Sequence, residues 1–180
     1  MAAANAGMET ECLDGGREDD MSMMSYRLVR MIETRSQELA ASLLDRVQNS
    51  RFTQNYRQNV PPEELKERVY EIYRHLGEWL IGKDKVHLEQ RYLQIGARRA
   101  SQQVPVSEVI WVIVLTKGNL WDFIRKEAVL ESPAEILGEM EMLQLLEQFF
   151  DRAIYYAAIG YERALAEQPL RDASAPSKKG

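Results

Sequence analysis

The chain has 180 residues, 45% of them hydrophobic and 28% charged, which is enough for one soluble globular domain with a sizeable core. Its net charge of -5 offers no electrostatic attraction to a nucleic acid, and no apolar run approaches the ~18 residues of a membrane-spanning helix. The N-terminus lacks the basic and apolar regions of a signal peptide, and the single cysteine, Cys12, cannot form an intrachain disulfide, so we expect a cytoplasmic protein.

Both ends of the chain are predicted to be tails. Residues 1–22 are rich in alanine, glycine and acidic residues and carry too little apolar surface to order themselves. The last residues, 169–180, begin with Pro169 and contain Lys178 and Lys179, and we expect them to be loose as well. Between the tails, residues 23–168 form one helical domain.

An amphipathic helix from Ser25 to Gln48 is predicted at the start of this domain. Its apolar residues recur at helical spacing on one face: Leu28, Ile32, Leu39, Leu43 and Val47. A polar connection from Asn49 to Val60 follows. We expect its two aromatic residues, Phe52 and Tyr56, to pack on the core, because aromatic rings in a loop need burial.

The next two helices follow from proline and glycine signals. The first runs from Pro61 to Gly82, with acidic residues in its opening turn and a left-handed stop at the glycine. Its buried stripe consists of Leu65, Val69, Ile72, Leu76, Trp79 and Leu80. The second is capped by Asp84 and runs to Gln102. On it, Gly96 predicts a close helix crossing, and Arg99 lies on the same face one turn later.

The longest apolar run lies within the next predicted helix, Val104 to Lys126. A strand is the alternative, but Pro105 and Glu108 at the start favour a helix. The expected buried face consists of Val106, Val109, Ile110, Ile113, Leu120, Trp121 and Ile124. Lys117 projects into this face, so it must be paired, reach water or meet a ligand; a paired or solvated lysine is the preferred interpretation. Trp111 and Leu115 project outside the face and predict a second covered surface.

A capping box, Ser132 to Glu135, opens the last helix, and no proline interrupts it before Pro169. This gives about 35 residues, on the order of 50 Å, which is long for a domain of this size. A seam of alternating three and four spacing runs along it: Leu143, Leu146, Phe150, Ala153, Ala157, Gly160 and Ala164. We predict that this seam is the interface of a two-fold homodimer. The alternative is a long helix packed wholly within its own subunit.

Signatures of catalysis are absent from the sequence. It contains no phosphate-binding glycine loop, no serine-hydrolase elbow and no paired-cysteine zinc pattern, so we expect neither an enzyme nor a cofactor. Two alternatives rest on histidines. His75 borders the stripe of its helix and could ligate a haem. A metal-dependent bundle enzyme is disfavoured, because His75 and His87 do not follow the Glu-x-x-His spacing of di-iron bundles.

The elements together predict an all-α fold, a bundle of five to six helices with a long C-terminal helix. If the bundle contains a ligand pocket, we expect it between the helix ending at Gln102 and the helix that follows. Four side chains there, Tyr92, Arg99, Lys117 and Trp121, would combine aromatic walls with cations for an acidic small molecule.

The stretch from Leu93 to Ile124 resembles the N-terminal domain of RsbRD-type RsbT co-antagonist proteins, a bacterial signalling family. The similarity lies in Gly96 and Arg99 one turn apart, in the segment Pro105 to Val109, and in Leu-Trp-Asp-Phe ending at Phe123; the order of helices extends it over Ser25 to Glu167.

The resemblance implies an all-helical, globin-related sensory module without haem, dimeric and placed before an output domain. In the co-antagonist proteins that output is a STAS domain phosphorylated by a serine kinase in the general stress response; similar domains precede histidine kinases. Only about a dozen residues follow Glu167 here, so no STAS phosphosite can be carried over. We expect either an adaptor for a separate output protein, such as a kinase or a STAS-type protein, or a fragment of a longer chain.

Overall fold

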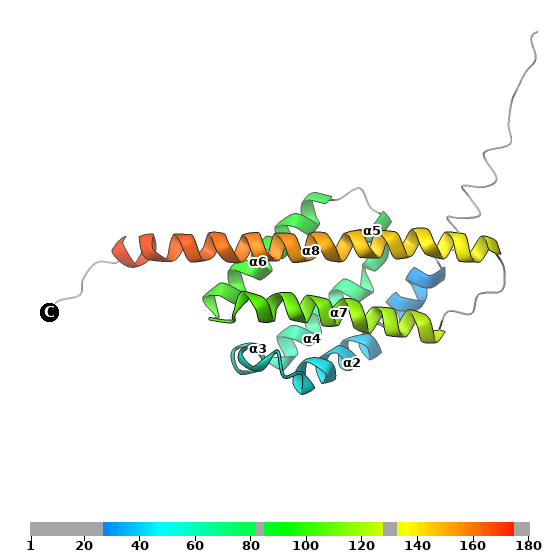
Figure 1. Cartoon of the computed structure of the whole chain (residues 1–180), viewed down its shortest axis with the longest axis horizontal. Coiled ribbons are helices and arrows are strands. Elements are labelled where there is room, and N and C mark those ends of the chain that lie inside the picture. The colour runs from blue at the N-terminus through cyan, green and yellow to red at the C-terminus, as the bar shows by residue number, and fades with distance from the viewer. Residues whose placement is uncertain (1–26, 82–84, 128–132, 175–180) are drawn as a thin grey trace, which may run out of the picture.

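The computed structural model describes residues 27–81, 85–127 and 133–174, and every regular element in these residues is a helix. The fold is an all-α bundle, as predicted (Figure 1). After a helical segment at residues 27–34, the helices are α2 (Ser36–Asn49), α3 (Gln54–Asn59), α4 (Pro62–Arg74), α5 (Leu76–Ile81), α6 (Lys85–Ser101), α7 (Val106–Glu127) and α8 (Pro133–Ser174). Among the described residues, no helix combines the length and apolar character needed to cross a membrane.

The first predicted helix is broken in two. Its apolar face is buried as expected, but a turn at Arg35 separates residues 27–34 from α2. The connection after α2 was predicted without regular structure, yet it contains α3. Glu108 accepts a 2.8 Å hydrogen bond from the Tyr56 backbone nitrogen in the first turn of α3, which supports this short helix. Tyr56 packs in the core, whereas Phe52 is 49% exposed, so the prediction of burial is wrong for Phe52.

The second predicted helix is also interrupted, at His75, which separates α4 from α5. A specific contact lies beside this break: Glu33 accepts a 2.9 Å hydrogen bond from the backbone nitrogen of Gly77. A side chain at position 77 would also meet Val29, 3.0 Å from its added Cβ. Residues 27–34 therefore dock against the start of α5, an interaction that no local sequence signal indicates. The predicted stop at Gly82 lies outside the described residues, as do Asp84 and Ser132.

The buried face of α7 is rotated relative to the prediction. It consists of Val109, Val112, Ile113, Thr116, Asn119, Leu120, Phe123 and Ile124. Val106, Ile110 and Trp121 are only half-buried. Two polar residues lie within the buried face because each is satisfied there: the Thr116 hydroxyl donates to the Val112 carbonyl (2.8 Å), and Asn119 Nδ2 donates to the Leu39 carbonyl (2.9 Å).

Helix α8 runs antiparallel to α7 and crosses α6 at close range (Figure 1). A Cβ built on Gly96 would lie 2.0 Å from the Ala157 carbonyl oxygen, and one built on Gly160 would lie 2.1 Å from the Leu93 carbonyl oxygen. Each helix therefore contributes a glycine where the other backbone approaches. The close crossing predicted from Gly96 is present, and its partner is a helix of the same chain.

The predicted dimer seam is occupied within the protomer, which corrects the sequence interpretation. Leu146, Phe150, Ala153 and Ala157 are at most 1% exposed, and Gly160 is buried. Leu143 packs against the same core, and Ala164 is half-buried. The small residues allow α6 to approach α8 closely. This face of α8 therefore packs within its own subunit, which was the alternative interpretation. The helix also continues to Ser174, past the end predicted at Pro169.

Candidate functional site

Arg99 is a deeply buried cation near the C-terminal end of α6, with 1% of the residue exposed. Its guanidinium lies over the Tyr56 ring, with Cζ 5.2 Å from the centroid, and Nε donates to the Tyr56 hydroxyl at 3.3 Å. Nη1 donates to Glu64 at 2.7 Å and to the Gln102 side chain at 2.6 Å. No described residue accepts a hydrogen bond from Nη2.

Glu64, in the first turn of α4, receives three arginines. One carboxylate oxygen lies 2.7 Å from Arg99 Nη1 and 3.4 Å from Arg68 Nε, and the other lies 2.8 Å from Arg98 Nη2. Partial burial alone would raise the pKa of Glu64, but the hydrogen bonds and positive charge of Arg99 and Arg98 outweigh it and lower the pKa to about 2. Glu64 is therefore the shared anion of three arginines from α4 and α6.

Charged side chains bridge α4 and α6. Besides the pairs from Glu64 to Arg98 and Arg99, Arg91 Nη2 lies 2.6 Å from Glu71. We call these three ion pairs the α4–α6 clasp. The backbones of the two helices make few close approaches, in contrast to α6 and α8. The clasp therefore joins two helices whose backbones do not pack directly against each other.

A cavity of about 50 Å³ lies at the same place, with walls from α3, α4, α6, α7 and α8. Its lining residues are Tyr56, Leu65, Arg68, Val69, Ile72, Tyr92, Ile95, Arg99, Val109, Val112, Ile113, Thr116 and Phe150. Tyr92 is 3% exposed, and no described residue forms a hydrogen bond with its hydroxyl. Burial raises the pKa of Tyr92, so this hydroxyl keeps its proton and is a donor at neutral pH. The cavity is thus apolar with a cation and a phenol on the α6 side.

The structure brings together two of the four residues predicted for a ligand pocket. Tyr92 and Arg99 line the cavity, whereas Lys117 and Trp121 lie on another face of α7 and bond to Glu147 of α8. Trp121 Nε1 donates to Glu147 at 3.0 Å, and Lys117 forms an ion pair with the same carboxylate. Adjacent helical residues point about 100° apart, so Thr116 faces the cavity and Lys117 does not. The preferred interpretation of Lys117, a paired lysine, is confirmed.

The histidine alternatives gain no support from the geometry. The His75 side chain is 52% exposed at the break between α4 and α5, with Nδ1 3.4 Å from Glu78. Cofactor sites usually offer about 300–1,000 Å³, so the cavity beside Arg99 is far too small for a haem. His87 is exposed on α6. Among the described residues, no group of three or more histidine, cysteine or acidic side chains could hold a metal ion.

Sequence reasoning missed Glu64, Tyr56 and Thr116 as parts of the site. Glu64 was assigned to the helix start, where acidic residues favour the helix dipole in any protein. Tyr56 was assigned to the core, which is correct, but its hydroxyl also receives Arg99. The only available signal was Arg99 itself, an arginine on the apolar face of its helix, which had to find an anion on a neighbouring element.

The residues of this site lie in a part of the sequence that matches the model of a known protein family. The family model described as "RsbT co-antagonist protein rsbRD N-terminal domain" matches residues 37–175, which is most of the chain. The chain belongs to this family. As an RsbRD N-terminal domain, it is a sensor-type signalling domain, in a regulatory family that is not known as catalytic. Neither the curated proteins nor the solved structures provide a match.

The matched region begins in α2 and includes α3 to α8, so it contains both the clasp and the α6–α8 crossing. The match was expected from the residues around Gly96 and Phe123.

Proposed function

We propose that this RsbRD N-terminal domain is a non-catalytic sensor or adaptor in bacterial stress or two-component-type regulation. It works by binding a small ligand or another protein and by forming a homodimer. The observation that carries the proposal is the family match over residues 37–175. Its output is a separate signalling protein, such as a kinase or a STAS-type protein.

Helix α8 is the element suited to carry a signal. Phe150 of α8 lines the cavity beside Arg99, and the Phe150 ring lies 5.1 Å from that of Phe149, which in turn lies 6.1 Å from the Tyr92 ring. The C-terminal end of α8 extends past the other helices (Figure 1). A ligand that displaces Phe150 would therefore move a rigid rod whose far end is accessible to a partner.

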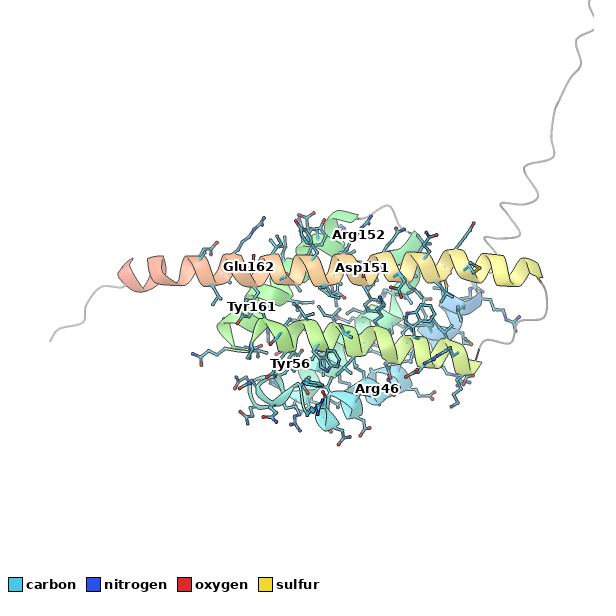
Figure 2. All side chains as sticks on the ribbon, viewed as in Figure 1. Arg46, Tyr56, Asp151, Arg152, Tyr161 and Glu162 are labelled. Atoms are coloured by element: carbon cyan, nitrogen blue, oxygen red, sulfur yellow. The ribbon has the colours of Figure 1, made fainter. Side chains whose placement is uncertain are left out.

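A second copy of the chain would cover the outer face of α8, opposite the α6 crossing. Tyr155 is 59% exposed and Leu165 is 44% exposed, while Ile159 between them is half-buried. Positions 155, 159 and 162 share one helical face, with Leu165 at its edge. Figure 2 shows Asp151 and Glu162 on α8, and by helical spacing both charged residues lie on the same face as Tyr155. Large exposed apolar side chains that lie among charged ones on one helix face support a subunit interface there.

Sedimentation velocity on the full chain tests the dimer. We expect a dimer at micromolar concentration and a monomer for the double variant Tyr155→Glu/Leu165→Glu, because two carboxylates would be desolvated at the interface. Gln58→Glu, exposed on α3 and away from α8, is the control and should stay dimeric. Ala157 is unsuitable as a test site because it packs against α6. A wild-type monomer at tens of micromolar would contradict the dimer.

A further inference from the structure

We infer that a pocket between α2, α3 and α4 binds an amphipathic monocarboxylate, with the carboxylate beside Arg57 and an aliphatic chain of about eight carbons against the apolar floor. This inference deepens the proposed sensor function, on which it rests, by naming the class of ligand. The pocket is distinct from the cavity beside Arg99, which is too small for such a ligand.

Size and lining are the first argument. The pocket has a volume of about 320 Å³, and proteins bind small molecules in pockets of about 300–1,000 Å³. Apolar side chains form its floor: Val47, Tyr56, Val60 and Leu65 are each at most 5% exposed, and Leu44 is half-buried beside them. No acidic residue lines the pocket. An aliphatic chain would therefore leave water for an apolar surface and meet no negative charge there.

Charge is the second argument. Arg57 is the one basic residue that lines the pocket, and its side chain is exposed at the rim. Its Nη1 donates to the Gln48 carbonyl at 2.5 Å, which ties the guanidinium to the last turn of α2. No described acidic side chain pairs with Arg57. A guanidinium has several further N–H donors, so Arg57 can bind a carboxylate and keep this hydrogen bond. One cation beside an apolar floor matches a ligand with one negative charge and an apolar chain.

The wall formed by Tyr56 and Leu65 connects the pocket to the α4–α6 clasp. Both residues line the pocket and also line the cavity of about 50 Å³ beside Arg99. The Tyr56 hydroxyl accepts a hydrogen bond from Arg99 Nε at 3.3 Å, and Phe150 of α8 lines the same cavity. Close-packed side chains have little space to shift, but this cavity provides some behind the wall. A ligand in the pocket would thus act through Tyr56 on Arg99 and α8.

The test is a titration of the full chain with sodium octanoate, followed by NMR of labelled isoleucine, leucine and valine methyl groups. Sodium chloride at equal ionic strength is the reference. We expect saturable shifts of the Val47, Val60 and Leu65 methyl signals, with a Kd of about 0.1 to 1 mM for a ligand of this size. The absence of a saturable shift up to about 10 mM octanoate would overturn the inference.

The same titration tests the connection to the clasp. Val112 and Ile113 line the cavity beside Arg99 but do not line the pocket. Their methyl signals should shift with the same Kd, because the wall between the two spaces moves. Shifts confined to Val47, Val60 and Leu65 would overturn the transmission through Tyr56.

Two further ligands test the chemical class. Affinity should rise about threefold for each methylene from butanoate to octanoate, because each methylene buries more apolar surface. Octylammonium has the same chain with the opposite charge and should bind at least about tenfold more weakly, because Arg57 repels it. The net charge of -5 would by itself favour the ammonium ion. An affinity independent of chain length, or equal binding of octylammonium, would overturn the assignment.

Two variants locate the carboxylate. Arg57→Gln changes an exposed side chain, so the protein should fold normally and bind octanoate about tenfold more weakly. Arg51→Gln is the matched control, because Arg51 is also exposed but does not line the pocket, and this variant should bind as the wild type does. Equal affinity of Arg57→Gln and the wild type would overturn the site.

The methyl signals report binding whether or not the chain dimerises. A failed titration with an intact dimer would therefore remove the ligand and leave the proposed function, and a monomer that binds octanoate would do the reverse.

Discussion

Helix α6 meets two neighbours in opposite ways. Toward α8, glycines bring the backbones into contact, with Gly96 against the Ala157 carbonyl and Gly160 against the Leu93 carbonyl. Toward α4, the helices stay apart, charged side chains bridge them and a cavity lies behind. Backbone contact leaves no space for movement, whereas an ion-paired boundary can open by exchanging protein partners for water or an anion. The α4 side of α6 is therefore the side that can open more easily, and the α8 side is the more rigid one.

The two sides should also differ in energy. Of the clasp residues, Arg98 and Glu71 have side chains about half exposed, at 50% and 52%, and exposed pairs contribute about 0–1 kcal/mol. Arg99 differs because it is buried: without an anion it would be an unpaired charge in the core, which costs several kcal/mol. The stability of the contact between α6 and α4 thus depends on the anion beside Arg99. The stability of the contact between α6 and α8 depends on the close fit of the two backbones.

The largest effect is expected from Gly96→Val. Any side chain at position 96 would collide with the backbone of α8, which cannot move aside as a flexible side chain could. We expect the free energy of unfolding to fall by about 3 kcal/mol or more, or the protein to fail to fold. Urea denaturation followed by far-UV circular dichroism measures this change.

Gly118 on α7 is the matched control, because a Cβ built there meets nothing within 4 Å. Gly118→Ala should raise the free energy of unfolding by up to about 1 kcal/mol, since alanine favours a helix. If Gly96→Val were as stable as the wild type, the close crossing of α6 and α8 would be wrong.

The next effect concerns Glu64→Gln, which removes the anion from Arg99. We expect a loss of about 1–2 kcal/mol at pH 7, after allowance for solvent screening of the partly exposed arginines. The folded-state pKa of Glu64, about 2, lies below its ordinary value of 4.5. The stabilisation is therefore complete above pH 4.5 and is lost as the pH falls from 4.5 toward 2.

Chemical denaturation of the wild type and of Glu64→Gln across this pH range measures the effect. The difference between the two proteins should shrink steadily as the pH falls, because protonated glutamic acid and glutamine are both neutral. A difference that stays constant between pH 5 and pH 2.5 would show that the charge of Glu64 contributes nothing.

Periodicity predicted the parts of the fold that depend on apolar repeats. The all-α class, the buried face of residues 28–47 and the small residues of the α6–α8 crossing all follow from spacing along one helix. The breaks at Arg35 and His75 could not be predicted in this way, because they depend on contacts such as that of Glu33 with Gly77, far away in sequence. The dimer seam was misassigned for the same reason, since spacing identifies a packed face but not its partner.

The site was half predictable. Tyr92 and Arg99 lie seven residues apart on one helical face, so their shared location follows from the sequence. Lys117 and Trp121 were predicted to lie beside them because the buried face of α7 was inferred from its apolar residues alone. The real arc of α7 contains Thr116 and Asn119, whose polar groups are satisfied by Val112 and Leu39. Because these polar residues form hydrogen bonds inside the bundle, they can be buried. The buried face of α7 therefore differs from the face that apolar residues alone predict.

The smallest effect is expected from Glu147→Gln, which weakens a charged bridge without a cavity behind it. Glu147 is 40% exposed and pairs with Lys117 across α7 and α8. We expect a loss of about 0.5 kcal/mol, which high salt removes. Asp151→Asn is the control, because Asp151 lies 3.9 Å from Lys117, is 72% exposed and should have no measurable effect. A loss as large as that of Glu64→Gln would mean that charge alone, and not burial beside the cavity, sets the energy of the α4–α6 clasp.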